Sequence, residues 1–428
     1  MVTTISVPRK EVDLARRIDR NLLIYGRRKV GKTYLIKNYL DYNVYMTVKR
    51  GGGIHIEGMP LKEIDDYNQF KDILIGLIRD GKAVVIDEFQ RLPDEFLDFL
   101  SIMTDEGGRV ILSGSSFHLV KRVFTPKSPV LGMFSEMKLS LISPSDIYLA
   151  LSTHTDPLKA YELSPYLRDP WSIRYFKGKE TKVEDIVYFS RNAIRALVGE
   201  AFLEEDRTLS AVYEAIIRQL SRGKWKMKEI ADVLHGRGMI PRSDASLIRP
   251  YIRNMEEMDI IGRQRIHGKN EFRYILRSPI MGLSFYLDEK IDFFDGDTDI
   301  KQVEKTIRER IPRHIEAFTG DLMAELYGGR FEYFYTSDFD IDFIITRGTG
   351  VVACGEVKWK DDVEKSDIEM FKERTKHLGG RKIIFSKNEI DAPGVVSITP
   401  ENLIEILGHR RDSGIVGAFG NMGNSGVR

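Results

Sequence analysis

The sequence of 428 residues has a single cysteine, a formal net charge of only +1 and no long apolar run. Because Cys354 has no partner within the chain, an internal disulfide bond and a cysteine-based zinc site are both excluded. No apolar segment reaches the roughly 18 residues that a membrane-spanning helix requires, and the first residues lack the apolar core of a signal peptide. We therefore expect a cytoplasmic protein with no membrane partner.

The charge balance and the length limit the possible classes of function and architecture. A net charge near zero excludes a protein that is basic over its whole surface, so any nucleic-acid contact must use a local patch. Hydrophobic residues make up 42% of the chain and charged residues 30%, which is typical of a folded globular protein. A chain of this length exceeds one hydrophobic core, so we expect about two to four domains.

A basic turn bounded by glycines follows an apolar run near the N-terminus. Residues 22–26 read LLIYG, which predicts a buried strand, and the later stretch TYLIKNYL has the spacing of a helix. Between them, residues 26–33 match the pattern G-x-x-x-x-G-K-[ST] at every position. In this pattern the backbone N–H groups of the loop surround phosphate oxygens, Lys32 reaches the β- and γ-phosphates, and Thr33 ligates Mg²⁺.

Two carboxylates at the end of a second apolar run supply the acidic partner that a phosphate loop needs. The stretch AVVIDE places Asp87 and Glu88 at the C-terminal edge of a predicted buried strand, where α/β sheets bind ligands. Asp87 suits the Mg²⁺ shell, and Glu88 suits polarisation of the attacking water. The next predicted strand, RVILSGSS, ends in hydroxyl groups that can meet a γ-phosphate. Ser113 is the first choice for this contact, with Ser115 and Ser116 as alternatives.

These motifs together resemble the archaeal ATPase family, an AAA+-related group within the STAND class of P-loop NTPases. They read YGRRKVGKT, VIDEFQRLP and ILSGSS, and they span about the first third of the chain. Where the family has an arginine in a later motif this chain has Met133, so Arg122 is the replacement candidate. Loop residues 27–29 fit a solvated loop tip as well as a phosphate contact. The candidates for binding ATP or ADP are Gly26, Arg27, Arg28, Lys29, Val30, Gly31, Lys32, Thr33 and Asp87, with Thr33 and Asp87 as the Mg²⁺ ligands.

Residues 141–280 read mainly as helices, followed by two short strands. The resemblance implies a small helical lid over 141–205, whereas periodicity alone indicates a helical region with a break at LRDPW. From residue 206 the order is three helices and two strands, which is the order of a winged helix. Pro250 lies within the third helical stretch, so that helix must either kink or begin late.

The two strands of this unit carry a local excess of basic residues. Few acidic residues accompany them, which is typical of a surface that contacts the phosphate backbone of DNA. DNA contact is favoured, and a winged helix that docks a protein partner is the alternative. The basic residues are Arg263, Arg265, His267, Lys269, Arg273 and Arg277.

A second chemical site is predicted in the C-terminal part, after an acidic linker over 281–300. A long helix is expected over about 301–326, followed by strands with a tight turn at RGTG. Pairing the strands about this turn brings Asp342 opposite Glu356, or one residue away, and period-two alternation puts Lys358 on the same face as Glu356. Adjacent carboxylates repel unless a cation lies between them, so Mg²⁺ or Mn²⁺ is the expected occupant.

An aspartate followed by Glu-Val-Lys-Trp resembles the PD-(D/E)xK nuclease superfamily and the nuclease-like domain often attached to archaeal ATPases. The resemblance implies that Glu316, on the preceding helix, completes a metal site with Asp342 and Glu356. Lys358 would then orient or deprotonate water. The tripeptide Glu-Val-Lys is common by chance, and alone it would indicate only a solvated charge pair on an edge strand. We therefore expect a nuclease-type fold and leave cleavage itself open.

We expect an α/β protein with a P-loop NTPase core, a helical lid, a winged helix and a C-terminal restriction-endonuclease-like domain. Its expected function is a Mg²⁺-dependent ATPase coupled to DNA binding and to metal-dependent DNA cleavage, with Glu88, Ser113 and Lys358 as catalytic candidates. An ATP-switched DNA-binding regulator without cleavage and a partner-docking STAND ATPase are the alternatives, and a homo-oligomer is open. The expected boundaries are 1–140 for the ATPase core, 141–205 for the lid, 206–280 for the winged helix, 281–300 for the linker, 301–408 for the nuclease-like domain and 409–428 for a flexible tail.

Overall fold

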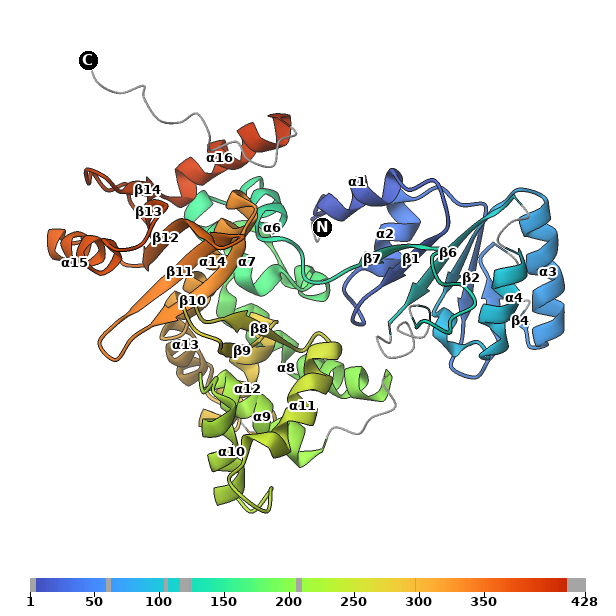
Figure 1. Ribbon diagram of the computed structural model, residues 1–428, viewed down its shortest axis with the longest axis horizontal. Helices are drawn as coiled ribbons and strands as arrows, with labels where there is room; N and C mark the ends of the chain where they lie inside the picture. The colour runs from blue at the N-terminus through green and yellow to red at the C-terminus, as the bar shows by residue number, and fades with distance from the viewer. Residues whose placement is uncertain are drawn as a thin grey trace.

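The computed structural model describes residues 5–58, 63–103, 107–115, 123, 125–204, 210–296 and 298–413. Two α/β parts lie at opposite ends of the molecule, with helices and a small hairpin between and below them (Figure 1). None of the helices in these ranges is long and apolar enough to cross a membrane.

The N-terminal part is an α/β unit built on a seven-stranded sheet. Its strands are β1 (Leu22–Tyr25), β2 (Val44–Val48), β3 (Ile54–Ile56), β4 (Glu63–Ile64), β5 (Ala83–Asp87), β6 (Arg109–Gly114) and β7 (Ser135–Lys138). Its helices are α1 (Lys10–Arg16), α2 (Lys32–Tyr39), α3 (Tyr67–Arg79) and α4 (Glu95–Met103), with the short 3-10 turn η1 (Phe89–Arg91). The strand order is β4-β3-β2-β5-β6-β1-β7, and the pairings from β2 to β7 are all parallel. The buried faces of α1 and α2 enter one core and those of α3 and α4 another, so helices cover both faces of the sheet (Figure 1).

The next part of the chain is helical, as expected. It contains α6 (Pro144–Ser152), α7 (Pro157–Leu167) and α8 (Val183–Glu204), with 3-10 turns η3 (Pro170–Tyr175) and η4 (Gly178–Glu180). The hydroxyl of Ser143 caps α6 by accepting the N–H of Asp146 at 3.2 Å. The predicted break at LRDPW is confirmed, because α7 ends at Leu167 and a separate turn begins at Pro170.

Three helices and a hairpin follow in the predicted order. They are α9 (Ala211–Ser221), α10 (Met227–Gly236), α11 (Ala245–Glu257), β8 (Ile261–Arg265) and β9 (Phe272–Leu276). The alternative of a late start for the third helix is wrong, because α11 begins well before Pro250. Asp244 caps the helix there by accepting the N–H of Ser246 at 2.8 Å.

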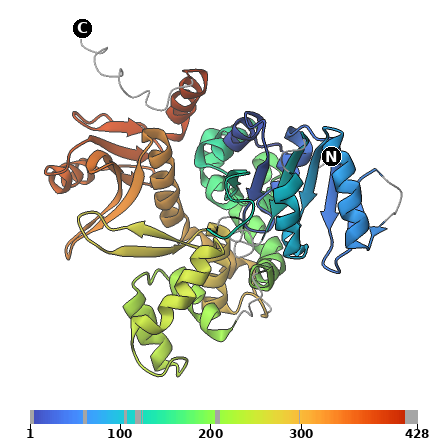
Figure 2. The same cartoon turned by 45° about the vertical axis from the view of Figure 1, so that its right-hand side comes forward.

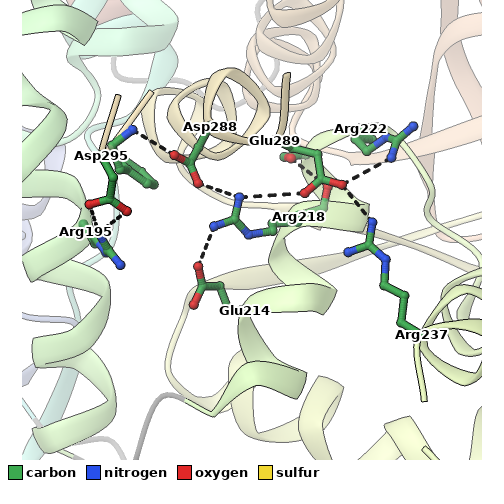
Figure 3. Close-up of polar contacts among 10 residues, drawn as sticks. Arg195, Glu214, Arg218, Arg222, Arg237, Asp288, Glu289 and Asp295 are labelled. Carbon is green, nitrogen blue, oxygen red and sulfur yellow. Dashed lines mark hydrogen bonds and ion pairs between the residues drawn. The ribbon is translucent and has the colours of Figure 1, made fainter. Parts of the chain in front are cut away.

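The prediction of a linker over residues 281–300 is wrong for most of that stretch. Helix α12 (Pro279–Ile291) occupies this stretch and buries an apolar face that includes Leu283 and Leu287. Three acidic residues of this stretch, Asp288, Glu289 and Asp295, form ion pairs with arginines from earlier in the chain (Figure 3). Composition alone therefore misled, because the compensating cations come from elements far back in the sequence.

The ion pairs around α12 differ strongly in burial (Figure 3). Arg218 of α9 lies 2.6 Å from Glu214 and 2.5 Å from Asp288, whose side chain is only 5% exposed. Arg195 and Asp295 form a pair at 2.7 Å that is mostly exposed. Loss of Arg218 would leave the buried carboxylate of Asp288 without its cation, whereas the exposed pair contributes little.

The C-terminal part is a second α/β unit with a five-stranded sheet. Its elements are α13 (Ile300–Arg308), α14 (Ile311–Tyr327), β10 (Arg330–Tyr335), β11 (Asp340–Arg347), β12 (Gly350–Lys358), α15 (Lys365–Thr375), β13 (Arg381–Ser386), β14 (Val396–Ile398) and α16 (Pro400–Ser413). The sheet order is β10-β11-β12-β13-β14, antiparallel up to β12 and parallel after it. The prediction of one long helix over 301–326 is wrong, because the helix is interrupted between Arg308 and Ile311. Pro312 lies in the first turn of α14, the part of a helix that tolerates proline. The expected tail begins too early, since α16 continues to Ser413; residues 414–428 lie outside the described ranges.

The helical region and the C-terminal sheet share one hydrophobic core, whereas the two cores of the N-terminal sheet draw only on residues 12–139. Tyr161 of α7 packs against Phe318 of α14 and Phe385 of β13, with ring centroids 5.1 and 4.5 Å apart. The hairpin β8–β9 lies beside β10 (Figure 2), where the N–H of His267 donates to the carbonyl of Tyr333 at 2.8 Å. The described residues beyond 140 therefore pack around a shared core and do not form separate, independent domains.

Candidate functional site

The loop between β1 and α2 has the backbone that its motif predicts. Gly26 leaves no room for a side chain, because a Cβ there would lie 2.1 Å from the carbonyl oxygen of Leu139. Gly31 has a φ of +96°, a left-handed conformation that favours glycine. A curled loop of this kind at a helix N-terminus directs backbone N–H groups toward a bound phosphate.

The two side chains that end the motif lie at the edge of the sheet. The buried ammonium group of Lys32 donates to the carbonyls of Gly26 at 2.8 Å and Arg27 at 3.2 Å. The hydroxyl of Thr33 donates to the carboxylate of Asp87 at 3.0 Å. The structure therefore brings the predicted Mg²⁺ ligands together and holds the lysine at the loop.

Tyr45 belongs to this site, although nothing in the local sequence points to it. Its hydroxyl donates to the same oxygen of Asp87 at 2.6 Å. Burial and the neighbouring Asp87 raise the pKa of Tyr45 far above its ordinary value, so the phenol stays protonated. The parallel pairing of β2 with β5 creates this contact, and it could be found only once the strand order was known.

Glu88 directly follows Asp87 and has a φ of +60°, which is uncommon for a residue other than glycine. Its carboxylate accepts hydrogen bonds from Gln90 at 2.6 Å and from Ser115 at 2.9 Å. The contact with the predicted catalytic glutamate is thus made by Ser115, one of the alternatives. Ser113 is fully buried, and its hydroxyl has no hydrogen-bond partner within the described ranges.

The arginines of the loop face the helical region. Arg27 forms an ion pair with Asp169, and both side chains are nearly buried. Arg28 lies 3.4 Å from Glu200 of α8. Lys29 is exposed. The first two arginines therefore connect the phosphate loop to helices beyond residue 140.

Ser116 and Arg122 lie outside the described residues. Met133, which stands where the resembling family has an arginine, packs against one of the two cores of the N-terminal sheet.

The geometry of this site agrees with a comparison of the sequence with known families. Residues 19–140 match the family model described as an AAA domain, and this stretch contains the loop, both carboxylates and the whole seven-stranded sheet. The chain therefore has an AAA-type P-loop ATPase domain. No curated protein matches the chain.

Solved structures resemble the chain only weakly. The ORC1 protein of Aeropyrum pernix, in complex with DNA, is 13% identical; the match covers 68% of this chain and 95% of that one, with a TM-score of 0.31. The ORC2 protein of the same organism, in ADPNP-ADP complexes, is 13% identical over 71% and 89%, with a TM-score of 0.34. Drosophila ORC bound to DNA is 9% identical over 72% and 89%, with a TM-score of 0.27. TM-scores this low do not establish a shared fold, and the assignment of the AAA domain rests on the family model alone.

The C-terminal hairpin brings the second set of predicted residues together. The register of β11 with β12 sets Asp342 opposite Glu356, as predicted. The carboxylate of Asp342 accepts the N–H of Val357 at 2.7 Å, and Lys358 donates to Glu356 at 2.9 Å. Arg374 of α15 lies 3.9 Å from Glu356.

We call Glu316, Asp342 and Glu356 the carboxylate cluster, and burial together with neighbouring acids raises the pKa values of Glu316 and Asp342. Burial raises the pKa of Asp342 well above its usual range, and Glu316 and Glu356 add to the effect. Burial also raises the pKa of Glu316 to about 7, with a further contribution from Asp340. Burial disfavours the charge on Lys358, but Glu356 outweighs this and raises the pKa of the lysine. The expected rise in carboxyl pKa values is therefore present.

The carboxylate cluster is not an assembled metal site. Within the described ranges, no three His, Cys, Asp or Glu side chains converge closely enough to hold a metal ion. Glu356 is engaged by Lys358, and Asp342 by the backbone of Val357. The donor types fit Mg²⁺ or Mn²⁺, and an ion at Glu356 would share that carboxylate with Lys358. Metal binding by Glu316, Asp342 and Glu356 therefore stays a prediction.

A cavity of about 510 Å³ opens beside the carboxylate cluster, between the hairpin β8–β9, helix α14 and strands β10 and β11. Glu316 and Asp342 line it, together with Asp340, which the sequence analysis did not select. Alternation along β11 puts Asp340 on the same face as Asp342, so the sequence pattern could have indicated that Asp340 lies near the carboxylate cluster. Arg273 of the hairpin and Arg313 of α14 bring positive charge to the same cavity.

The six basic residues of the hairpin do not share one surface. His267 bonds Glu332 at 2.7 Å and Arg273 lies over the ring of Tyr333, so both turn toward the C-terminal sheet. The other four are exposed, but two of them form ion pairs. These pairs are Arg263 with Glu256 at 3.7 Å and Arg277 with Asp259 at 3.3 Å. The exposed part of the predicted phosphate-binding footprint therefore consists of Arg263, Arg265, Lys269 and Arg277, and the charges of Arg263 and Arg277 are partly compensated by their acidic partners.

Proposed function

We propose that this protein hydrolyses ATP in a Mg²⁺-dependent reaction at the loop of residues 26–33. The observation that carries the proposal is the 3.0 Å contact between Thr33 and Asp87, beside a lysine already buried at the loop. Thr33 and Asp87 would hold the ion, which supplies positive charge to the phosphates when bound. Lys32 would exchange the carbonyls of the loop for phosphate oxygens.

Glu88 is the proposed group that orients the attacking water. It lies next to Asp87, at the C-terminal end of β5, and the hydrogen bonds from Gln90 and Ser115 fix its carboxylate. Glu88 and the phosphate loop lie at the same edge of the sheet, so a water bound by Glu88 would lie close to the terminal phosphate. If the hydroxyl of Ser115 also contacted the terminal phosphate, the position of the Glu88 carboxylate would depend on whether ATP is bound.

Phosphate release from ATP, measured with Mg²⁺ and with EDTA, tests the proposal. We expect hydrolysis only with Mg²⁺, and Asp87→Asn should lower it by about 100-fold, because the ion loses its charged ligand. Tyr34→Ala changes an exposed neighbour of Thr33 and serves as the control, with nearly unchanged activity. Equal hydrolysis by Asp87→Asn and wild type would contradict the site.

We also propose metal-dependent cleavage of DNA at the carboxylate cluster, in a PD-(D/E)xK-like domain over 301–408. Support comes from Asp342, Glu356 and Lys358 meeting across one hairpin, with Glu316 entering from α14. The raised pKa values indicate repulsion that a cation would relieve. When bound, the ion would supply Lewis acidity; Asp342 and Glu356 would hold it, and Lys358 would position the attacking water.

The stretch between the two sites is proposed to present the DNA. We assign residues 206–280 as a winged helix and 141–205 as a lid, on the order of their elements. The exposed Arg263, Arg265 and Lys269 would contact backbone phosphates. Replacing all three with alanine should weaken DNA binding for every sequence and flatten its salt dependence.

Incubation with single-stranded, duplex and branched DNA, with Mg²⁺ or Mn²⁺, tests cleavage. We expect Glu356→Gln to abolish it, whereas Glu369→Gln, at an exposed position of α15, should cut like wild type. If the wild type binds DNA but leaves every form intact, an ATP-switched DNA-binding regulator replaces the nuclease. If it does not bind DNA, a partner-docking ATPase does.

A further inference from the structure

The cavity beside the carboxylate cluster is bordered by aromatic side chains that the proposed chemistry does not use. Trp225, in the connection between α9 and α10, lies edge-on to Tyr335 of β10, with ring centroids 5.3 Å apart. Tyr333, two residues earlier on the same face of β10, stacks with Tyr335 at 6.1 Å. All three rings are partly exposed, and Trp225 and Tyr333 line the cavity.

Cations surround these rings. Lys269 lies 3.7 Å from the centre of the Tyr335 ring, and the guanidinium of Arg273 lies 4.3 Å from that of Tyr333. The Nε of Arg273 is buried without a hydrogen-bond partner among the residues that the structure describes. Arg313 brings a second guanidinium to the same cavity. Such donors favour an anion that can accept their hydrogen bonds.

We propose that the cavity and its rim bind single-stranded DNA, with bases against Trp225 and Tyr335 and a backbone phosphate between Arg273 and Arg313. Interleaved aromatic and basic side chains are the composition of stacking platforms for single strands, because every base offers a flat face. A volume of about 510 Å³ is in the range that holds one small ligand, such as an unstacked nucleotide, and has no room for a paired strand.

The bound strand would lie next to the carboxylate cluster. Glu316 and Asp342 line the same cavity as the two arginines, so the phosphate and these carboxylates would be neighbours. With the proposed cleavage function, on which this consequence rests, the substrate is a single-stranded end or flap and not continuous duplex.

Binding of a labelled oligo(dT) of about 15 nucleotides to the full chain in EDTA tests the inference, with a blunt hairpin duplex for comparison. Fluorescence anisotropy should show about tenfold tighter binding of the single strand. Tyr335→Ala should weaken this binding by roughly 5- to 100-fold, as expected for the loss of one base–aromatic stack. Phe272→Ala removes an exposed ring of the hairpin β8–β9 that does not line the cavity, and should bind like wild type.

Two further variants separate contact from packing. Trp225→Phe keeps a ring, so the affinity should stay within about threefold while the quenching of tryptophan fluorescence by oligo(dT) disappears. Lys269→Gln changes an exposed side chain, and should weaken binding severalfold and flatten its salt dependence even if Tyr335→Ala fails to fold.

Equal binding of the duplex, unaltered binding by Lys269→Gln, or quenching that persists in Trp225→Phe would overturn the inference. Because the assay contains no metal, its result does not depend on cleavage. A protein that prefers single strands but cuts nothing loses only the nuclease proposal. A protein that cuts duplex DNA without preferring single strands loses only this inference.

Discussion

The phosphate loop and the carboxylate cluster are both charged sites at a sheet, but they are assembled in different ways. The loop takes Lys32 and Thr33 from one turn and Asp87 from a nearby parallel strand. The carboxylate cluster takes Glu316 from a helix and its other members from two strands of a hairpin, and a second hairpin from another part of the chain closes the cavity beside it.

The two sites also treat their charges differently in the absence of a ligand. At the loop, the carbonyls of Gly26 and Arg27 satisfy Lys32, and Thr33 bonds Asp87. In the carboxylate cluster, buried acids face one another and their pKa values rise. The polar groups of the first site are therefore satisfied without a ligand, whereas the second site holds buried carboxyl groups whose ionisation is unfavourable.

Among the variants that test this contrast, Lys32→Ala should have the largest effect, which is a loss of ATP affinity. Removing the buried ammonium group should weaken ATP binding by about 1,000-fold, because a charged hydrogen-bonding partner of the phosphates is lost. Lys82→Ala, at an exposed lysine just before β5 and at the other end of that strand from Asp87, is the control and should bind within about twofold of wild type. Titration with a fluorescent ATP analogue measures both, and equal affinities would refute the phosphate-binding role of Lys32.

Glu88→Gln should separate binding from hydrolysis. The amide keeps the shape of the side chain but cannot polarise water, so turnover should fall by about 100-fold while ATP affinity stays nearly constant. Phosphate release under saturating ATP measures the rate. If turnover is unchanged, another group must orient the water.

Arg218→Ala should sharpen the contrast between buried and exposed charge in the scaffold. The variant leaves the buried carboxylate of Asp288 without its cation, and the free energy of unfolding should fall by about 3 kcal/mol or more. Arg195→Ala breaks an exposed pair of the same network (Figure 3) and should cost less than about 0.5 kcal/mol. Urea unfolding distinguishes the two, and similar losses would mean that burial does not govern this network.

Glu316→Gln should remove a pH dependence from the second site. The pKa of Glu316 is raised from 4.5 to about 7, so its protonated form favours the folded state. This contribution is fully present below about pH 4.5 and is lost as the pH rises to about 7, with a size of roughly 1–3 kcal/mol. Unfolding of wild type and variant across this range measures the difference: the two should be similarly stable near pH 4.5, and the variant should become the more stable protein as the pH rises to about 7. A constant difference would contradict the raised pKa.

The difference between the phosphate loop and the carboxylate cluster also explains how much of each site could be predicted from the sequence. Residues 26–33 are contiguous, and their pattern specifies strand, loop and helix directly, so the loop was found without any knowledge of packing. Asp87 and Glu88 were found because they end an apolar run. For the carboxylate cluster, the turn at RGTG set the approximate register, but a bulge between Ile345 and Thr346 decided which residues stand opposite each other.

Contacts between distant segments could not be predicted. The ion pair of Arg27 with Asp169 joins residues 142 positions apart, and the cavity is closed by Arg273 from the hairpin. Helix α12 was missed because its acidic residues indicate a solvated linker until arginines from other helices are placed beside them. Each of these depends on which elements pack together, and a periodic pattern carries no information on that choice.

The central claim is that one chain holds two independent chemical sites. Its most direct test measures ATP hydrolysis and metal-dependent cleavage of single-stranded DNA on the same preparations of wild type, Lys32→Ala and Glu356→Gln. We predict that Lys32→Ala loses hydrolysis, and that Glu356→Gln loses cleavage while hydrolysing ATP within about twofold of wild type. Cleavage that persists in Glu356→Gln, or hydrolysis in that variant as slow as in Lys32→Ala, would contradict the claim.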